Sequence, residues 1–299
     1  MGRRATALPI ELTSGPFRTR DAEERRVTAG RLRAKDLVTP IRGVRLSGHA
    51  DDLDARCRAF LLHRDERLAF SHTTAAELLG APLPLAARDH NRLHVSVPRG
   101  ERAVQAASVI GHTLAAWSTT TVRGLPVTTP EQTWLDLAGV LGRDALISAG
   151  DWLVSYRHPL TTLERLVVAV RSSAGRRGIA NARAALPLIR TRSESPAETR
   201  LRLLIRDAGL CEPELNYLIH ERDGAFLARV DMAFPDQRVV LEYEGDGHRV
   251  DRDVWFRDIR RREDLEDLGW RVVRVTAADL HAPAPLIARL SRLLTTRRE

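Results

Sequence analysis

The sequence predicts a mixed α/β protein made of several successive units, and two observations support this prediction. Helical and strand patterns alternate along most of the 299 residues. The last third has the order helix, three strands, helix, strand and helix. The apolar share of 43% is ordinary for a chain that buries hydrophobic cores. The length suffices for two or three domains.

Four segments differ in pattern and in charge. They are a winged-helix-like unit over residues 1–46, a mixed α/β domain over 47–154, a helical arginine-rich linker over 155–190 and a domain with candidate catalytic residues over 191–299. Of the net charge of +8, the first and third segments carry +6 each and the other two carry −2 each. Basic segments attract phosphate backbones through counterion release, but solvated surface explains such modest excesses equally well.

The first segment has the order helix, turn, helix and strand. Thr28 is placed to cap a helix over residues 29–37, and a strand follows over 41–46. This is the order of a winged helix-turn-helix, in which the second helix contacts DNA. The basic side chains that would project from this helix are Arg31, Arg33 and Lys35. A helix-turn-helix is also a common protein-interaction scaffold, so both uses stay open.

The second segment contains short helices and strands without an evident catalytic pattern. We expect a helix after Ser71, a strand over 93–97 and a helix that begins after Thr129. His90 and His94 are four residues apart, but a strand over 93–97 would not place them as two ligands on one helical face. We therefore interpret this segment as a structural or interaction domain.

Carboxylates lie on two neighbouring strands of the last segment. Asp231 lies on the first strand, and Glu242 and Glu244 alternate along the second. Residues two apart on a strand share a face, and a short turn between the strands would bring Asp231 close to Glu242. Three carboxylates in one place repel one another unless a divalent cation binds them. The pattern favours a cation site over the alternative of a solvent-facing strand edge.

These acids belong to an ordered set of motifs. The pieces are Ser195-Pro196-x-Glu198-x-Arg200, Arg229-Val230-Asp231, Val240-x-Glu242-Tyr243-Glu244-Gly245-x-x-His248, Arg257-Asp258-x-Arg260-Arg261 and Leu268-Gly269-Trp270-Arg271-Val272-x-Arg274-Val275. The set resembles the DUF559 domain, a branch of the PD-(D/E)xK nuclease superfamily near the very-short-patch-repair endonucleases. The resemblance implies a restriction-endonuclease-like mixed sheet flanked by helices. It also implies Mg²⁺ (or Mn²⁺) held by Asp231 and Glu242, with Glu198 nearby.

The chain departs from the superfamily motif at position 244, where the motif has lysine. Lys35 is the only lysine in the chain, so no lysine is available to the C-terminal segment. Glu244 would instead bind a second metal ion or orient water, and His248 would act as general base unless it only forms local loop hydrogen bonds. Glu198 has an alternative use in a capping box with Ser195.

One helix of the last segment carries several arginines. If it follows the resemblance, these side chains grip the DNA backbone; otherwise they pair with acids one turn away on the same helix. They are Arg257, Arg260 and Arg261.

Motifs of a second kind lie in the first half of the chain. They are Arg42-Gly43-Val44, His72-x-Thr74-Ala75-Ala76, Val95-x-Val97-Pro98 and Gly124-Leu125-Pro126-Val127-Thr128-x-Pro130-x-x-Thr133-x-x-Asp136-Leu137-Ala138. Residues 17–154 are similar to the AbiEi-type antitoxin arrangement of a winged helix followed by a mixed domain. This resemblance implies a toxin or defence-system protein as a partner.

The leading hypothesis is a Mg²⁺-dependent DNA endonuclease that hydrolyses phosphodiester bonds. The alternative is a non-catalytic, antitoxin-like DNA-binding regulator with a degenerate nuclease domain. A third hypothesis gives residues 47–154 a protein-interaction role in a toxin–antitoxin or phage-defence pair. Cys57 and Cys211 have no disulfide or zinc spacing, and no stretch reaches membrane-spanning length. We therefore expect a cytoplasmic protein without a membrane partner.

Overall fold

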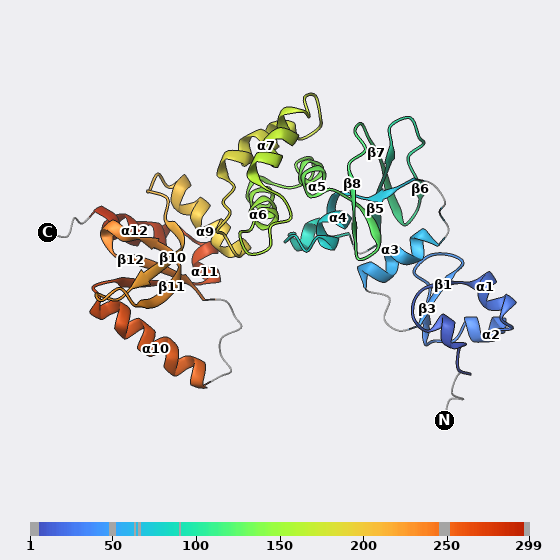
Figure 1. Cartoon of the computed structure of the whole chain (residues 1–299), viewed down its shortest axis with the longest axis horizontal. Coiled ribbons are helices and arrows are strands. Elements are labelled where there is room, and N and C mark those ends of the chain that lie inside the picture. Colours follow the sequence, from blue (N-terminus) through green and yellow to red (C-terminus); the bar gives the residue numbers. More distant parts are fainter. Residues whose placement is uncertain are drawn as a thin grey trace. The chain divides into compact units, whose positions relative to one another are not determined.

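The structure is a computed structural model of the chain. It describes residues 6–47, 52–62, 64, 67–89, 91–244 and 252–295, and within 252–259 only the backbone. The helices and mixed sheets confirm the predicted α/β class (Figure 1). The chain divides into two compact units, one of residues 1–141 with 168–180 and one of residues 142–167 with 181–299. The finer division into four segments stays a prediction.

The N-terminal part of the first unit is a small sheet with short helices. Its elements are η1 (Ile10–Leu12), β1 (Phe17–Arg18), α1 (Thr19–Glu24), α2 (Ala29–Leu32), β2 (Leu37–Val38) and β3 (Val44–Ser47), and the strands lie in the order β1-β3-β2. The Thr28 hydroxyl caps α2 by accepting the Arg31 N–H at 3.2 Å, as predicted. The helix is shorter than the predicted 29–37, because Leu37 and Val38 pair with β3 instead.

The rest of the first unit is built on a six-stranded mixed sheet in the order β6-β7-β5-β4-β9-β8. The strands are β4 (Ala69–Phe70), β5 (Leu93–Pro98), β6 (Gln105–Ala106), β7 (Val109–Leu114), β8 (Thr119–Val122) and β9 (Leu125–Thr128). The helices are α3 (Leu53–Leu61), α4 (His72–Leu78), η2 (Leu85–Ala87) and α5 (Pro130–Leu137). The strand at 93–97 and the helix after Thr129 are confirmed.

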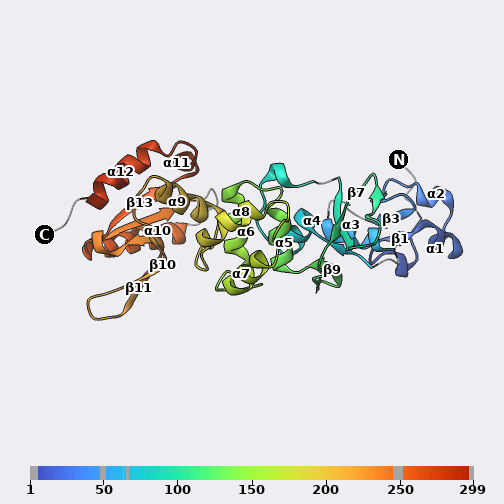
Figure 2. The same ribbon diagram turned by 90° about the horizontal axis from the view of Figure 1, so that it is seen from above.

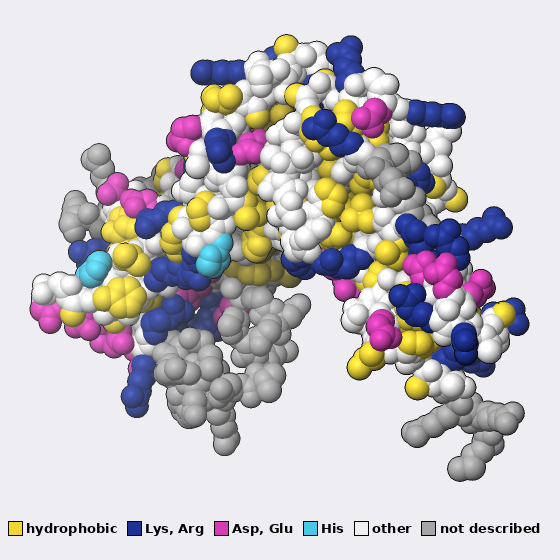
Figure 3. Space-filling view, turned by 45° about the vertical axis from the view of Figure 1, so that its right-hand side comes forward, with side chains coloured by type: hydrophobic (Ala, Val, Ile, Leu, Met, Phe, Trp, Pro, Cys, Tyr) yellow, Lys and Arg dark blue, Asp and Glu magenta, His cyan; other side chains and the backbone are white. Residues whose placement is uncertain are grey.

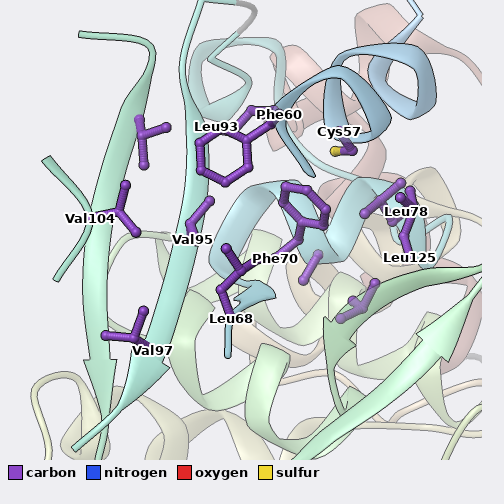
Figure 4. Packing of buried hydrophobic residues seen from close by; sticks show 13 residues of the cluster. Cys57, Phe60, Leu68, Phe70, Leu78, Leu93, Val95, Val97, Val104 and Leu125 are labelled. Carbon is purple, nitrogen blue, oxygen red and sulfur yellow. The ribbon is translucent and has the colours of Figure 1, made fainter. Parts of the chain in front are cut away.

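The core of this sheet determines which way the β5 side chains point. Leu93, Val95 and Val97 lie in one apolar cluster that also contains Phe70 (Figure 4). Because successive strand residues face opposite sides, the residues between them face away from this cluster. His94 is one of these residues, and the chemistry of the first unit depends on this orientation.

Four helical segments follow α5 along the chain. They are α6 (Arg143–Leu153), α7 (Leu163–Arg171), α8 (Ile179–Ala185) and η3 (Leu186–Leu188). Gly178 has a φ of +81°, and an added Cβ there would lie 2.5 Å from the Ala138 backbone. Only glycine fits this approach, which holds the segment before α8 against the end of α5.

The C-terminal part of the second unit is a four-stranded mixed sheet between helices. Its elements are α9 (Pro196–Asp207), β10 (Glu214–His220), β11 (Phe226–Phe234), η4 (Pro235–Gln237), β12 (Val239–Tyr243), α10 (Arg252–Asp267), β13 (Arg271–Val275), α11 (Ala277–His281) and α12 (Ala284–Thr295). The order matches the sequence prediction, with the short α11 as an addition.

The sheet has the order β10-β11-β12-β13, in which β10, β11 and β12 are antiparallel and β13 is parallel to β12. Apolar side chains of α9, α11 and α12 share a core with one face, whereas Leu265 of α10 packs in the core of the other face. The helices α12 and α10 accordingly lie on opposite sides of the sheet (Figure 1), and the β10–β11 loop projects from it (Figure 2).

A buried ion-pair network connects α6 to α9 within the second unit. Arg202 is fully buried, and its guanidinium lies 3.0 Å from Asp151 and 3.2 Å from Glu212. The Thr199 hydroxyl donates a further hydrogen bond to Asp151 at 2.8 Å. A buried charge is tolerated only when it is paired and hydrogen-bonded, so these groups depend on one another.

We predict that Arg202→Met lowers the free energy of unfolding by about 3–5 kcal/mol, because it leaves the buried Asp151 carboxylate without its cation. Urea denaturation followed by circular dichroism measures the change. Arg206→Met, on the exposed side of the same helix, is the matched control and is expected to cost about 0.5 kcal/mol or less. Equal losses of stability in both variants would contradict this account of the network.

Candidate functional site

Asp231 lies where two paired strands separate. In the pairing of β11 with β12, Phe234 lies opposite Val239 and Met232 lies opposite Leu241. Asp231 and Glu242 are the next residues on the two strands. At this point Asp231 Oδ2 accepts a hydrogen bond from the Tyr243 N–H at 3.0 Å. The carboxylate therefore takes the place of a backbone partner at the fork between β11 and β12.

The strand on the other side of Asp231 is also irregular. Leu215 pairs with Met232 and Tyr217 pairs with Val230, so the register places Asn216 opposite Asp231. Asn216 has a φ of +48°, and its amide donates a hydrogen bond to the Arg192 carbonyl at 2.6 Å. This left-handed residue, unusual within a strand, interrupts the regular ladder beside Asp231.

Glu198 lies in the first turn of α9 and is only 7% exposed. Ser195 caps the helix by accepting the Glu198 N–H at 3.1 Å, as the capping-box pattern predicts. The Glu198 carboxylate, however, accepts the N–H of Glu194 at 2.9 Å, one residue before the expected donor. It thus gives a hydrogen-bond acceptor to a backbone N–H just before the helix begins.

Glu198 also lies within electrostatic range of Asp231. Burial raises the pKa of Glu198 to about 7, and the negative charge of Asp231 contributes in the same direction. An acid that shares a pocket with a second carboxylate is disfavoured in its charged form. The structure therefore brings these two predicted site residues into electrostatic contact.

The two glutamates of the β12 motif have arginine partners. Glu242 lies 2.7 Å from the guanidinium of Arg261 on α10. Glu244 lies 2.8 Å from Arg274 on β13, and both of these side chains are close to half exposed. Two of the acids predicted for this edge, Glu242 and Glu244, thus have cationic partners within the domain.

The predicted acids do not form one tight ligand cluster. Within the described part of the chain, the only set of three or more potential ligand residues with ligand atoms all within 4.8 Å of one another is His72, His94 and His112. Glu198, Asp231, Glu242 and Glu244 are not gathered to that degree. His248 lies outside the described residues, and so does the side chain of Arg257.

The remaining predicted DNA contacts fall into two groups. Arg260 is exposed, whereas Arg261 is engaged with Glu242. Pairing within α10 is seen instead between Arg262 and Glu266, at 2.8 Å. On the face shown in Figure 3, basic side chains are interspersed with acidic and apolar ones.

The basic side chains around α2 are not equivalent. Arg31 forms a two-pronged ion pair with Asp36, at 2.9 and 2.7 Å, and its side chain is only 9% exposed. Arg33 and Lys35 are exposed. Arg31 therefore stabilises the turn after α2, and the other two are the side chains available to a ligand.

The histidine set is not predicted by the sequence patterns. These patterns relate His94 only to His90, which lies outside the described residues, and they do not predict the strand that carries His112. Gly111 weakens the strand pattern there, yet a Cβ at this position would lie 2.1 Å from the Val104 carbonyl oxygen. The signal available in the sequence is a histidine next to a glycine in an otherwise apolar stretch, which is weak alone.

Comparison with known proteins finds relatives for part of the chain. Two proteins of Mycobacterium tuberculosis are each 38% identical to it over 175 residues: Uncharacterized protein MT2308 of strain CDC 1551 / Oshkosh and Uncharacterized protein Rv2248 of strain ATCC 25618 / H37Rv. The match covers 58% of this chain and spans 63% of the length of each relative. No family profile and no solved structure matches the chain.

No helix among the described residues has both the length and the apolar character needed to cross a membrane.

We predict that Glu198 makes folding stability depend on pH near neutrality. Its carboxyl keeps a proton up to about pH 7 when folded but only to about 4.5 when unfolded. The contribution is complete below about pH 4.5 and is lost as the pH rises through about 7. The loss is on the order of 3 kcal/mol, because folding raises the pKa from 4.5 to about 7.

Urea titrations in EDTA at several pH values measure this contribution. Glu198→Gln mimics the protonated acid and can still accept the Glu194 N–H, so its stability should vary less with pH. Glu214→Gln, at an exposed position on β10, is the control and should keep the wild-type slope. Parallel curves for wild type and Glu198→Gln would show that Glu198 ionises normally.

Proposed function

We propose that the C-terminal segment is a Mg²⁺-dependent DNA endonuclease of the PD-(D/E)xK type. The topology supports this: α9 precedes three antiparallel strands, and α10 then leads to β13, which is parallel to β12. The resemblance implies a mixed sheet of this kind between helices. The observation that carries the proposal is the Asp231 carboxylate at the fork of β11 and β12, with buried Glu198 beside it.

The donor atoms are carboxylate oxygens, which suit a hard divalent cation, although the acids are not gathered into one tight cluster. Asp231 and Glu242 would hold the ion, and Glu198 would complete the oxygen ligands that Mg²⁺ prefers. Burial raises the pKa of Glu198 and the negative charge of Asp231 adds to the shift, so a cation bound there would stabilise the carboxylate form. The ion would supply a water of lowered pKa and would neutralise charge on the scissile phosphate.

In this proposal an arginine supplies the positive charge that lysine provides in the superfamily motif. Glu244 stands at the lysine position and is paired with Arg274. Arg261 reaches Glu242 from α10 and lies beside the proposed metal ligands. Arginine stays protonated, so Arg261 would bind phosphate rather than take a proton. The general base in this proposal is His248.

The DNA contacts proposed for this function are exposed basic side chains. Near α2 they are Arg33 and Lys35, and on α10 they are Arg260 and, by its position in the motif, Arg257. Cys57 and Cys211 are free thiols, in keeping with a DNA-processing protein of the reducing cytoplasm. A toxin or defence-system protein stays the proposed protein partner of the first unit.

A second candidate function is DNA-binding regulation without cleavage. The ion pairs of Glu242 with Arg261 and of Glu244 with Arg274 favour it, because both acids already have cationic partners within the domain. A regulator would bind DNA equally well with Mg²⁺ and with EDTA. A nuclease of the proposed type would need the ion for cleavage.

We predict that Asp231→Asn reduces Mg²⁺-dependent nicking of supercoiled plasmid by about 100-fold or more, since metal-assisted charge stabilisation contributes several kcal/mol. Agarose-gel nicking assays with Mg²⁺ and with EDTA provide the measurement. Asp236→Asn is the matched control, because Asp236 is exposed on η4 of the same domain. Undiminished nicking by Asp231→Asn would remove Asp231 from the site, and a wild type that binds but never nicks would establish the regulator.

We predict that Arg33→Ala combined with Lys35→Ala weakens DNA binding and makes it less sensitive to salt. For each phosphate-binding side chain removed, the slope of log affinity against log salt should become shallower by about 0.9. Fluorescence anisotropy with duplex DNA at several salt concentrations measures both effects. Arg99→Ala with Arg102→Ala removes two exposed charges elsewhere in the first unit and should leave the slope unchanged; equal effects would assign binding to overall charge.

A further inference from the structure

Three histidines meet on the side of the six-stranded sheet that faces away from the apolar core of Figure 4. His94 lies on β5, and His112 lies on the neighbouring β7, where it pairs in register with Ser96. His94 and Ser96 are two apart and share a face, so His112 lies on that face too. His72, the first residue of α4, completes the set.

The three imidazole rings are stacked and nearly parallel. The ring centres of His72 and His112 are 3.7 Å apart, and His94 is 5.2 Å from each of them. His94 Nδ1 and His112 Nε2 lie 2.9 Å apart. One nitrogen from each residue can be chosen so that all three lie within 4.8 Å of one another.

Burial disfavours the charged form of all three rings. Burial lowers the pKa of His72 to about 2 and that of His112 to about 4, and it lowers the pKa of His94 as well. A neutral imidazole has one ring nitrogen with a free lone pair, which is the form that binds metal ions. The set thus offers one lone pair from each ring, once the proton between His94 and His112 has moved to another ring nitrogen.

A buried carboxylate lies behind His72, beyond hydrogen-bond distance. Asp136 is 3% exposed, and its Oδ2 lies 3.7 Å from His72 Nδ1. The amide of Gln132 donates to Asp136 Oδ1 at 3.0 Å, and Arg176 forms an ion pair with the same oxygen. Histidine ligands commonly direct their second nitrogen toward such a carboxylate. Nδ1 of His72 therefore faces this carboxylate, and Nε2 is the nitrogen left for a ligand.

The arrangement does not fit a serine nucleophile. Ser71 Oγ lies 3.1 Å from His72 Nδ1, the same nitrogen that Asp136 approaches. A serine triad needs the serine and the acid on opposite nitrogens of the imidazole. Ser71 also accepts a hydrogen bond from the Ser96 hydroxyl at 2.7 Å, which places it in a structural chain of hydroxyls.

We propose that His72, His94 and His112 form a binding site for one divalent transition-metal ion of the Zn²⁺ type. With Zn–N bonds of about 2.05 Å, tetrahedral ligand nitrogens are about 3.3 Å apart. The His94 and His112 nitrogens, 2.9 Å apart, need to separate by a few tenths of an ångström. The His72 ring, which is stacked on His112, has to turn so that its nitrogen points at the same ion. Nitrogen ligands select Zn²⁺, Co²⁺ or Ni²⁺ over Mg²⁺, so this site is separate from the proposed carboxylate site.

Three protein ligands leave the fourth position of a tetrahedral ion for water or for a small anion. The site is thus an open one by its ligand count. It lies in the segment that the sequence patterns indicate to be structural or interacting, and it does not depend on the nuclease proposal.

Metal binding by the full-length protein tests this inference. After EDTA treatment and dialysis, we expect the chain to take up about one equivalent of Zn²⁺, measured by elemental analysis and by competition with a coloured chelator. Co²⁺ should give the visible absorption of a tetrahedral site. His94→Gln and His112→Gln should each weaken Zn²⁺ binding by about 100-fold or more, because removal of a direct ligand should exceed the 10–100-fold effect of a supporting residue.

The matched control is His158→Gln, at an exposed histidine of the second unit, which should bind Zn²⁺ like the wild type. Circular dichroism in EDTA verifies that the variants are folded, and a Zn²⁺-dependent rise in melting temperature should occur only in wild type, His158→Gln and Asp231→Asn. Wild type without Zn²⁺ uptake would overturn the proposal and leave a hydrogen-bonded histidine stack. Full Zn²⁺ uptake by His112→Gln would overturn it too, and parallel loss of Zn²⁺ uptake in Asp231→Asn would move the ion to the carboxylates.

Discussion

The cost of burying charge is the constraint on which the arrangement of both units depends. In the second unit, Arg202 has no exposed surface and is tolerated only because Asp151 and Glu212 bind it. In the first unit, Asp136 is also buried and forms an ion pair with Arg176. Each of these links joins segments that are distant in sequence, so the pairing of charges helps to position those segments within their unit.

The same constraint shapes both candidate sites. Burial raises the pKa of Glu198, whereas Glu242 forms an ion pair with the guanidinium of Arg261. The histidine set avoids the problem because burial favours neutral imidazoles, which still offer a lone pair. A metal ion would therefore have opposite consequences in the two places. It would compensate negative charge at the fork of β11 and β12, and it would introduce positive charge among neutral rings, with Asp136 nearby.

The parts of the fold that the sequence predicts correctly are those set by short-range chemistry. Ser195, Thr28 and Thr129 are predicted as helix caps, and each accepts an N–H from its own first turn. Such bonds involve residues three apart, so the sequence contains all that is needed to infer them. The strands around Asp231 are predictable for a similar reason, because an alternating apolar pattern followed by a tight turn is a local signal.

The errors have long-range causes. The helix α2 ends earlier than predicted because Leu37 pairs with β3, a strand several residues later in the chain. The histidine set brings together residues from 72 to 112, and its assembly needs the parallel pairing of β5 with β7. Because the sequence patterns do not predict β7, the spacing of the histidines cannot reveal that β5 and β7 pair.

The scarcity of lysine has a practical consequence. Lys35 is the only lysine in the chain, and it is exposed just after α2. Reagents that acylate primary amines therefore have a single side-chain target, besides the α-amino group at the chain start. A dye attached there would report directly on the surroundings of the proposed recognition helix, and no engineered cysteine would be needed.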